Sequence, residues 1–226
     1  MQTPRFLAAV EVLYATFAAS RPGHIAGCPC CIADKKVDVL LRTPLRTLSA
    51  ADLEPYASAV LVTVGEEADF RFFLPRIIEL TGFLPDDWPS PEILLGKLML
   101  AGWEGWSERE RYAVTEAIDG LLELWLLTEP FNGRKVDQLI CGACLAGLDP
   151  EPWLQRLAEP GRIRGLVSLY ERNAARLSAE GQLANPHWAG ATPEAAGAVA
   201  AFLLSSQVEA QMWDWYGRKA SDRQVR

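Results

Sequence analysis

The sequence has little alternating strand pattern, no long apolar run and no cluster of basic residues. Its longest apolar stretch after the N-terminal region, "AAGAVAAFLL" from Ala195, is about half of the ~20 residues that a membrane-spanning helix needs. The 22 Lys and Arg residues are scattered and are outnumbered by 29 Asp and Glu residues, which gives a net charge of -7. Such a balance disfavours binding to nucleic acid or to anionic membranes. We therefore expect any macromolecular partner to be a protein.

Catalytic constellations are also missing. The chain contains only two histidines, and no stretch assembles the nucleophile, base and oxyanion donors of a known reaction. The 226 residues are 50% apolar and 23% charged, which excludes disorder and provides enough apolar surface for a full core. We infer from this a folded chain without a recognisable enzyme motif.

The N-terminal stretch "FLAAVEVLYATFAAS" resembles a signal peptide only superficially, because Glu11 lies in its middle. Its apolar residues recur at helical spacing, so we predict an amphipathic core helix. The five cysteines are an odd number and no export signal accompanies them, which is typical of a reducing compartment. The expected location is the cytoplasm.

Helix-start signals recur along the whole sequence. Ser49 and Ser107 each begin a capping box, and Ser90 and Thr192 each precede a proline suited to a first helical turn. The one candidate strand, residues 58–65, has no partner, so we interpret it as the end of a β-branched helix. The pattern predicts an all-α fold of stacked antiparallel helix pairs, HEAT-like although without a fixed-period repeat, and with a cysteine-rich loop after the first helix.

Composition also predicts how the chain is divided. Residues 1–180 are expected to form one helical domain. The segment "GQLANPHWAGAT", residues 181–192, is expected to be a linker. Residues 193–226 are expected to form a C-terminal part docked on the same domain, with one long helix ending near Trp215.

The most unusual stretch is "RPGHIAGCPCCIADK", residues 21–35, in which three cysteines occupy four positions. A C-x-x-C loop can direct two thiolates to one Zn²⁺, and a nearby imidazole or thiol can complete the site. The predicted zinc ligands are His24, Cys28, Cys30 and Cys31. A redox role for Cys28 and Cys31 is the alternative, since this spacing lowers the pKa of a cysteine, although the βαβ context of thioredoxins is missing.

Two further features have mainly structural interpretations. Cys141 and Cys144 form a second C-x-x-C, but 109 residues separate the two pairs and the neighbouring residues are apolar, which favours packing in a core. Pro75 lies inside a helical pattern and is expected to kink or divide the helix. Arg76 is expected to pair with a carboxylate such as Glu79 or to cap the freed carbonyls.

Three segments together carry a resemblance: "GCPCC" at 27–31, "FRFFLPRIIEL" at 70–80 and "LLGKLMLAGWEGWSERER" at 94–111. In order and spacing they are similar to a family of uncharacterised bacterial all-helical proteins with a cysteine cluster, an FLPR segment and a GKL…GW…W-x-x-ER segment. The resemblance covers roughly the first half of the chain. It implies a shared fold and a shared cysteine feature, and it assigns no catalytic residue.

These observations favour a non-catalytic macromolecule-binding protein with a structural metal or thiol knot. A thiol-dependent redox protein using Cys28 and Cys31 is the alternative of a different class. An immunity-type inhibitor is a third possibility, which the acidic net charge favours.

Overall fold

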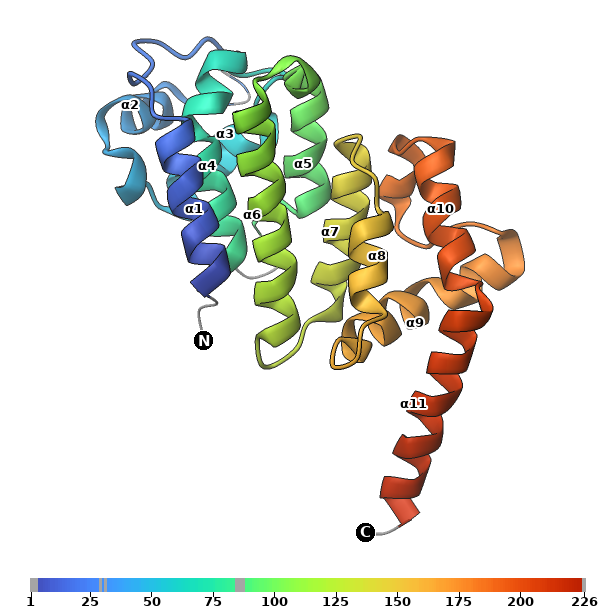
Figure 1. Cartoon of the computed structure of the whole chain (residues 1–226). Coiled ribbons are helices and arrows are strands. Elements are labelled where there is room, and N and C mark those ends of the chain that lie inside the picture. The colour runs from blue at the N-terminus through green and yellow to red at the C-terminus, as the bar shows by residue number, and fades with distance from the viewer. Residues whose placement is uncertain (1–3, 29, 31, 84–87, 225–226) are drawn as a thin grey trace. The chain divides into compact units, whose positions relative to one another are not determined.

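The computed structural model describes residues 4–28, 30, 32–83 and 88–224, and in this part of the chain it contains 11 α-helices, three 3-10 helices and no strand (Figure 1). The predicted all-α class is therefore confirmed, while the HEAT-like stacking stays a prediction. No helix in the described ranges is both long and apolar enough to cross a membrane.

The chain forms two compact units, residues 1–128 and 129–226. The first contains α1 (Pro4–Thr16), α2 (Asp34–Arg42), η1 (Leu45–Thr47), α3 (Ala50–Ala59), α4 (Glu67–Phe83), α5 (Pro91–Leu100), η2 (Trp103–Gly105) and α6 (Glu108–Leu127). The second contains α7 (Gly133–Leu145), α8 (Glu151–Leu157), α9 (Ile163–Glu180), η3 (Pro186–Gly190), α10 (Pro193–Leu203) and α11 (Ser206–Gln224). The expected linker, residues 181–192, thus lies within the second unit and includes η3. The net charge of -7 belongs to the first unit, because the second has 11 basic and 11 acidic residues.

Local capping signals place the helix starts where the sequence predicts them. Ser49 and Ser107 form complete capping boxes with Asp52 and Glu110. The predicted single final helix is wrong, because α10 ends at Leu203 and α11 begins at Ser206. The physical reason is a second cap: the Ser205 hydroxyl accepts a hydrogen bond from the backbone N–H of Val208 at 3.3 Å, which starts a new helix.

The segment 58–65 also differs from its interpretation as a helix end. Helix α3 ends at Ala59, and residues 60–64 form a tight turn in which Leu61 has a φ of 63°. Val64 forms isolated bridges with Val60 and with Gly27. The β-branched valines prefer extended backbone, and the loop after α1 supplies the pairing partner that the sequence pattern did not reveal.

Helix α4 runs through Pro75 without interruption, so the expectation that this proline divides the helix is wrong. The structural interpretation of Arg76 is confirmed: its Nη1 donates to Glu79 Oε2 at 2.7 Å. Its Nε donates to the carbonyl oxygen of Leu48 at 2.9 Å, and the Tyr14 hydroxyl donates to the same Glu79 oxygen at 2.6 Å. This network ties α1, α4 and the segment before α3 together.

The core of the first unit depends on the close approach of α1 to α4 and α6. The fully buried Phe6 lies against two glycines. A Cβ atom on Gly120 would lie 2.9 Å from Phe6 Cα, and one on Gly82 would lie 2.4 Å from a Phe6 ring carbon. Both positions therefore need glycine for the helices to pack at this distance.

Candidate functional site

The loop that carries the predicted zinc ligands lies between α1 and α2 and is held against the turn after α3. The backbone N–H of Cys28 donates to the Thr63 carbonyl at 3.0 Å, and the N–H of Gly65 donates to the Ala26 carbonyl at 2.6 Å. Ile25 is buried and anchors the start of the loop. Two long-range backbone hydrogen bonds and one apolar anchor thus fix the loop from Ile25 to Cys28.

The predicted ligands differ in exposure. Cys28 is half-buried, whereas Cys30 and His24 are exposed. Cys31 lies outside the described residues. Among the residues that are described, no three His, Cys, Asp or Glu side chains form a group that could hold a metal ion. The four-ligand set therefore stays a prediction.

A buried polar pair lies behind this loop. A Cβ on Gly65 would lie 3.2 Å from the Tyr56 hydroxyl and 3.3 Å from Asp69 Oδ2, so these two groups flank the same glycine. Burial raises the pKa of Asp69, while the backbone N–H of Glu66 and the charge of His24 lower it. Burial also raises the pKa of Tyr56, and the charge of Asp69 adds to that shift. Sequence reasoning missed this pair because its members belong to α3 and α4.

The second cysteine pair has the packing role that the sequence favours. Cys141 and Cys144 are both buried in α7. Burial raises the pKa of the Cys144 thiol to about 12, and the charge of Asp149 adds to this. A thiol with such a pKa stays protonated at neutral pH and is a poor nucleophile or metal ligand.

The second unit contains a pocket that the sequence did not predict. It begins where α9 ends, at Gly181, whose φ of 67° turns the chain back along the unit. The chain then passes through the loop 181–192, in which the Asn185 side chain caps η3 by accepting from the backbone N–H of His187 at 3.0 Å. Thr192 caps α10 in the same way, by accepting from Ala195 at 3.2 Å. One local cap therefore starts η3 within the loop, and a second starts α10 at the end of the loop.

A buried hydrogen-bond network attaches the loop 181–192 to α7 and α9. Asp137 on α7 is 1% exposed, and its two carboxyl oxygens accept from the side-chain amides of Asn173 at 3.0 Å and Asn185 at 3.1 Å. Asn173 on α9 is fully buried and accepts from the backbone N–H of Ala184 at 2.8 Å. Its amide also donates to the Leu169 carbonyl at 2.9 Å. One carboxyl group and one amide thus join α7, α9 and the loop.

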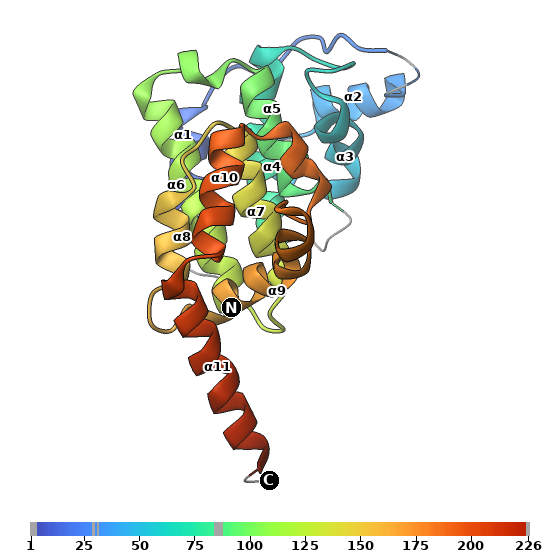
Figure 2. The same cartoon turned by 90° about the vertical axis from the view of Figure 1, so that its right-hand side faces the viewer.

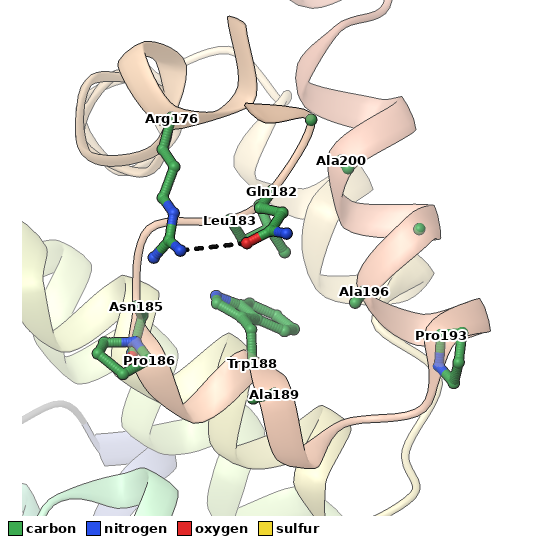
Figure 3. A pocket seen from close by; sticks show the side chains of 12 residues that line it. Arg176, Gln182, Leu183, Asn185, Pro186, Trp188, Ala189, Pro193, Ala196 and Ala200 are labelled. Carbon is green, nitrogen blue, oxygen red and sulfur yellow. Dashed lines mark hydrogen bonds between the residues drawn. The ribbon is translucent and has the colours of Figure 1, made fainter. Parts of the chain in front are cut away.

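The pocket lies between this loop, the end of α9 and one face of α10 (Figure 3). Its volume is about 600 Å³, within the range of sites for small organic ligands. The wall from α10 is small and apolar, and the opposite side carries polar groups. The lining residues are Arg176, Gly181, Gln182, Leu183, Asn185, Pro186, Trp188, Ala189, Pro193, Ala196, Gly197 and Ala200.

Trp188 and Arg176 give the pocket its chemistry. The Trp188 side chain is 6% exposed, and its indole N–H has no acceptor among the described residues. In Figure 3 the indole ring lies across the pocket with its nitrogen toward Arg176. The Arg176 guanidinium donates to Glu180 at 2.9 Å and to Gln182 at 3.1 Å. Because a guanidinium has five N–H groups, further donors remain for a ligand.

Two sequence signals point to this pocket in retrospect. Asp137 interrupts the apolar face of α7, and a carboxyl group in such a position needs buried partners. "NPHW" combines a cap, a proline at the first helical position and a large aromatic residue, which is typical of a short ordered helix. Neither signal identifies Asn173 or Arg176, which lie on α9.

Comparison with known proteins gives no match: no family model, no curated protein and no solved structure is similar to this chain. The resemblance carried by the segments at 27–31, 70–80 and 94–111 stays a prediction. Within the structure, the second and third segments meet. Arg71 on α4 pairs with Glu110 on α6 and lies over the Trp106 ring, and the Trp106 indole N–H donates to Glu67 at 2.9 Å. These residues therefore support the packing of the first unit.

Proposed function

We propose that the protein is a non-catalytic binding protein and that the pocket of its second unit binds a carboxylate attached to an apolar body. The observation that carries the proposal is the enclosed Trp188 indole N–H without an acceptor, in a pocket that also presents Arg176. A buried donor without a partner costs about 1–3 kcal/mol, and an arriving acceptor recovers that cost.

The shape and composition of the pocket support the apolar part of this ligand. Ala196, Gly197 and Ala200 on α10 leave room for a hydrocarbon chain or ring. A Cβ on Gly197 would meet no atom within 4 Å, so the α10 wall is open at that position. Apolar contact on one wall and two convergent donors on the other are the usual arrangement in small-ligand sites.

Two sources share this chemistry: a free organic acid and the carboxyl terminus of a partner protein that ends in an apolar residue. Phenylacetate and its uncharged counterpart phenylacetamide are suitable probes for the first source. A short peptide with a free C-terminal carboxylate, compared with the same peptide amidated at its C-terminus, tests the second. Tighter binding of the free peptide than of the small acid would indicate a protein partner.

The indole signals of the eight tryptophans in a ¹H–¹⁵N spectrum provide the readout. Trp188→Phe identifies the signal of the pocket residue, and we expect the acids, but not the matched amides, to shift it. Arg176→Gln should weaken binding about tenfold, the low end for a charged hydrogen bond, because the side chain is 41% exposed.

Arg172→Gln is the matched control, since this arginine lies one turn earlier on α9 and does not line the pocket. We expect it to bind the acid probes as the wild type does. The proposal is overturned if no acid shifts the Trp188 signal at about 10 mM, a concentration above the dissociation constant expected for a specific ligand. Equal binding of acid and amide would also overturn it.

The cysteine loop supports a second, structural proposal: His24, Cys28, Cys30 and Cys31 hold one Zn²⁺ that closes the loop after α1. What supports it is the composition of the loop, with four soft or borderline donors in eight residues, and the anchoring of Cys28 to Thr63. The competing redox function predicts a metal-free protein in which Cys28 reacts rapidly with a thiol reagent at neutral pH.

A further inference from the structure

Helix α10 presents one straight strip of small side chains to the pocket of the second unit. Pro193, Ala196, Gly197 and Ala200 all line the cavity. At about 100° per residue, these four positions fall within about 100° of one another around the helix axis. From Pro193 to Ala200 the helix rises about 10 Å, so the strip is roughly two turns long.

The core contacts of α10 use other residues. Val199, Phe202 and Leu203 are buried, and none of these three lines the pocket. Pro193 and Gly197 on the strip are exposed. Figure 2 shows α10 on the face of its unit that is turned to the viewer, with no other described helix of that unit in front of it. The strip therefore faces the cavity and solvent rather than the core.

The polar groups of the pocket lie on the side opposite this strip. The Trp188 side chain is 6% exposed, and its indole N–H has no acceptor among the described residues. In Figure 3 the indole ring extends from its nitrogen, which is turned to Arg176, toward Ala196 on α10. A carboxylate bound at Arg176 and the indole N–H thus directs the carbon atoms attached to it along the ring and toward the strip.

The length of the strip indicates the form of the apolar body. An extended hydrocarbon chain advances about 1.3 Å per carbon, because its C–C bonds are about 1.5 Å long. The strip can therefore contact about eight carbons of a straight chain, whereas a ring with the same number of carbons covers only part of it. A fully buried methylene strengthens binding about fourfold, and we expect about threefold on a wall that is open on one side.

We propose that the pocket selects straight-chain carboxylic acids and that the α10 strip sets the preferred chain length. This specificity rests on the function proposed for the pocket, because the carboxylate must first bind at Trp188 and Arg176. The affinity should rise about threefold per methylene, which gives roughly eightyfold between butanoate and octanoate. Cyclohexylacetate has as many carbons as octanoate in a compact shape, and it should bind at least about fivefold more weakly.

Titration of the full chain with these three acids, followed by the Trp188 indole signal, tests the proposal. Ala196→Leu obstructs the strip near its middle, so it should weaken octanoate at least about tenfold and change butanoate less than about twofold. Gly197→Leu should act in the same way, and it has room in the fold because a Cβ there would meet no atom within 4 Å. Ala198→Leu is the matched control, since Ala198 is exposed on the same helix and does not line this pocket.

The possible failures are distinguishable. If no carboxylate shifts the Trp188 signal, the function proposed for the pocket fails and the specificity fails with it. If all three acids bind with similar affinity, the carboxylate site stands and the straight-chain specificity is overturned. Tighter binding of cyclohexylacetate, or of a peptide with a free C-terminal carboxylate, than of octanoate would also overturn it. So would wild-type affinity for octanoate in both Ala196→Leu and Gly197→Leu.

Discussion

Replacing Asn173 with alanine tests whether one buried amide holds the pocket loop in place. The wild-type side chain makes three hydrogen bonds, to Asp137, to the Leu169 carbonyl and from the Ala184 N–H, and it is fully buried. The alanine variant removes all three at once. It leaves one oxygen of the buried Asp137 and the N–H of the half-buried Ala184 without their partner.

The expected cost follows from these two groups. A buried polar group that loses its partner costs about 1–3 kcal/mol. The buried Asp137 oxygen belongs near the upper end of this range and the half-buried Ala184 N–H near the lower end, so together they cost about 4 kcal/mol. This corresponds to roughly a thousandfold change in the unfolding equilibrium constant of the second unit. The Leu169 carbonyl adds little to the cost, because it lies in α9 and keeps its helical environment.

Urea denaturation, followed by tryptophan fluorescence, measures this change. The transition that includes Trp188 should move to a lower midpoint with an unchanged slope, because the surface exposed on unfolding stays nearly the same. Limited proteolysis should in addition cut the variant within residues 181–192, where the loop has lost its attachment to α9.

Arg172→Ala is the control for this experiment, because the Arg172 guanidinium lies 3.9 Å from the same Asp137 and is 42% exposed. An ion pair of this kind contributes less than about 1 kcal/mol. If Asn173→Ala also costs less than about 1 kcal/mol and the loop stays protected, the network is not what orders the loop.

Three other changes test the first unit and the cysteines. Cys28→Ser or Cys31→Ser should release about one zinc per chain in metal analysis. Cys141→Ser should keep the metal and lower the free energy of unfolding through lost packing alone, by on the order of 1 kcal/mol. Equal metal loss in all three variants would indicate a four-cysteine site. Gly120→Ala should lower the free energy of unfolding by about 1–3 kcal/mol in urea, because its Cβ would overlap the backbone of α1; an unchanged midpoint would show that the helices can separate at no cost. Burial raises the pKa of Asp69, so the contribution of its protonated form to stability is complete below the ordinary pKa of the group and is lost as pH rises through the raised value. The free energy of unfolding of Asp69→Asn, measured across a pH series, should therefore increase relative to that of the wild type in this pH window. A difference between the two proteins that stays constant with pH would contradict this.

Local chemistry explains why most of the helices were predictable. The capping boxes at Ser49 and Ser107 and the cap at Thr192 act over three residues, so the sequence contains each cap and its partner together. The same locality explains one error. Ser205 lies inside an otherwise continuous helical pattern, and nothing nearby shows that its hydroxyl caps a new helix rather than facing solvent.

The pocket depends on interactions that a sequence pattern does not contain. Asp137 is 36 residues from Asn173 and 48 residues from Asn185, and only the packing of α7 against α9 brings the three together. The turn at residues 60–64 is hidden from the sequence pattern for the same reason, since Gly27, the partner of Val64, lies on another loop. Both features consist of polar or backbone groups whose partners are distant in the chain.

Asn185 belongs both to the buried hydrogen-bond network of Asp137 and Asn173 and to the lining of the pocket. Its amide donates to Asp137, and the same residue lines the cavity beside Trp188. Ordering of the loop and binding of a ligand are therefore coupled, and a variant that loosens the loop lowers the apparent affinity by the fraction of molecules in which the loop is ordered. Loss of binding in Asn173→Ala would thus show only that the pocket needs an ordered loop. Loss of binding in Arg176→Gln with an unchanged unfolding midpoint would instead identify a contact to the ligand itself, because Arg176 contacts Glu180 and Gln182 and takes no part in the buried network.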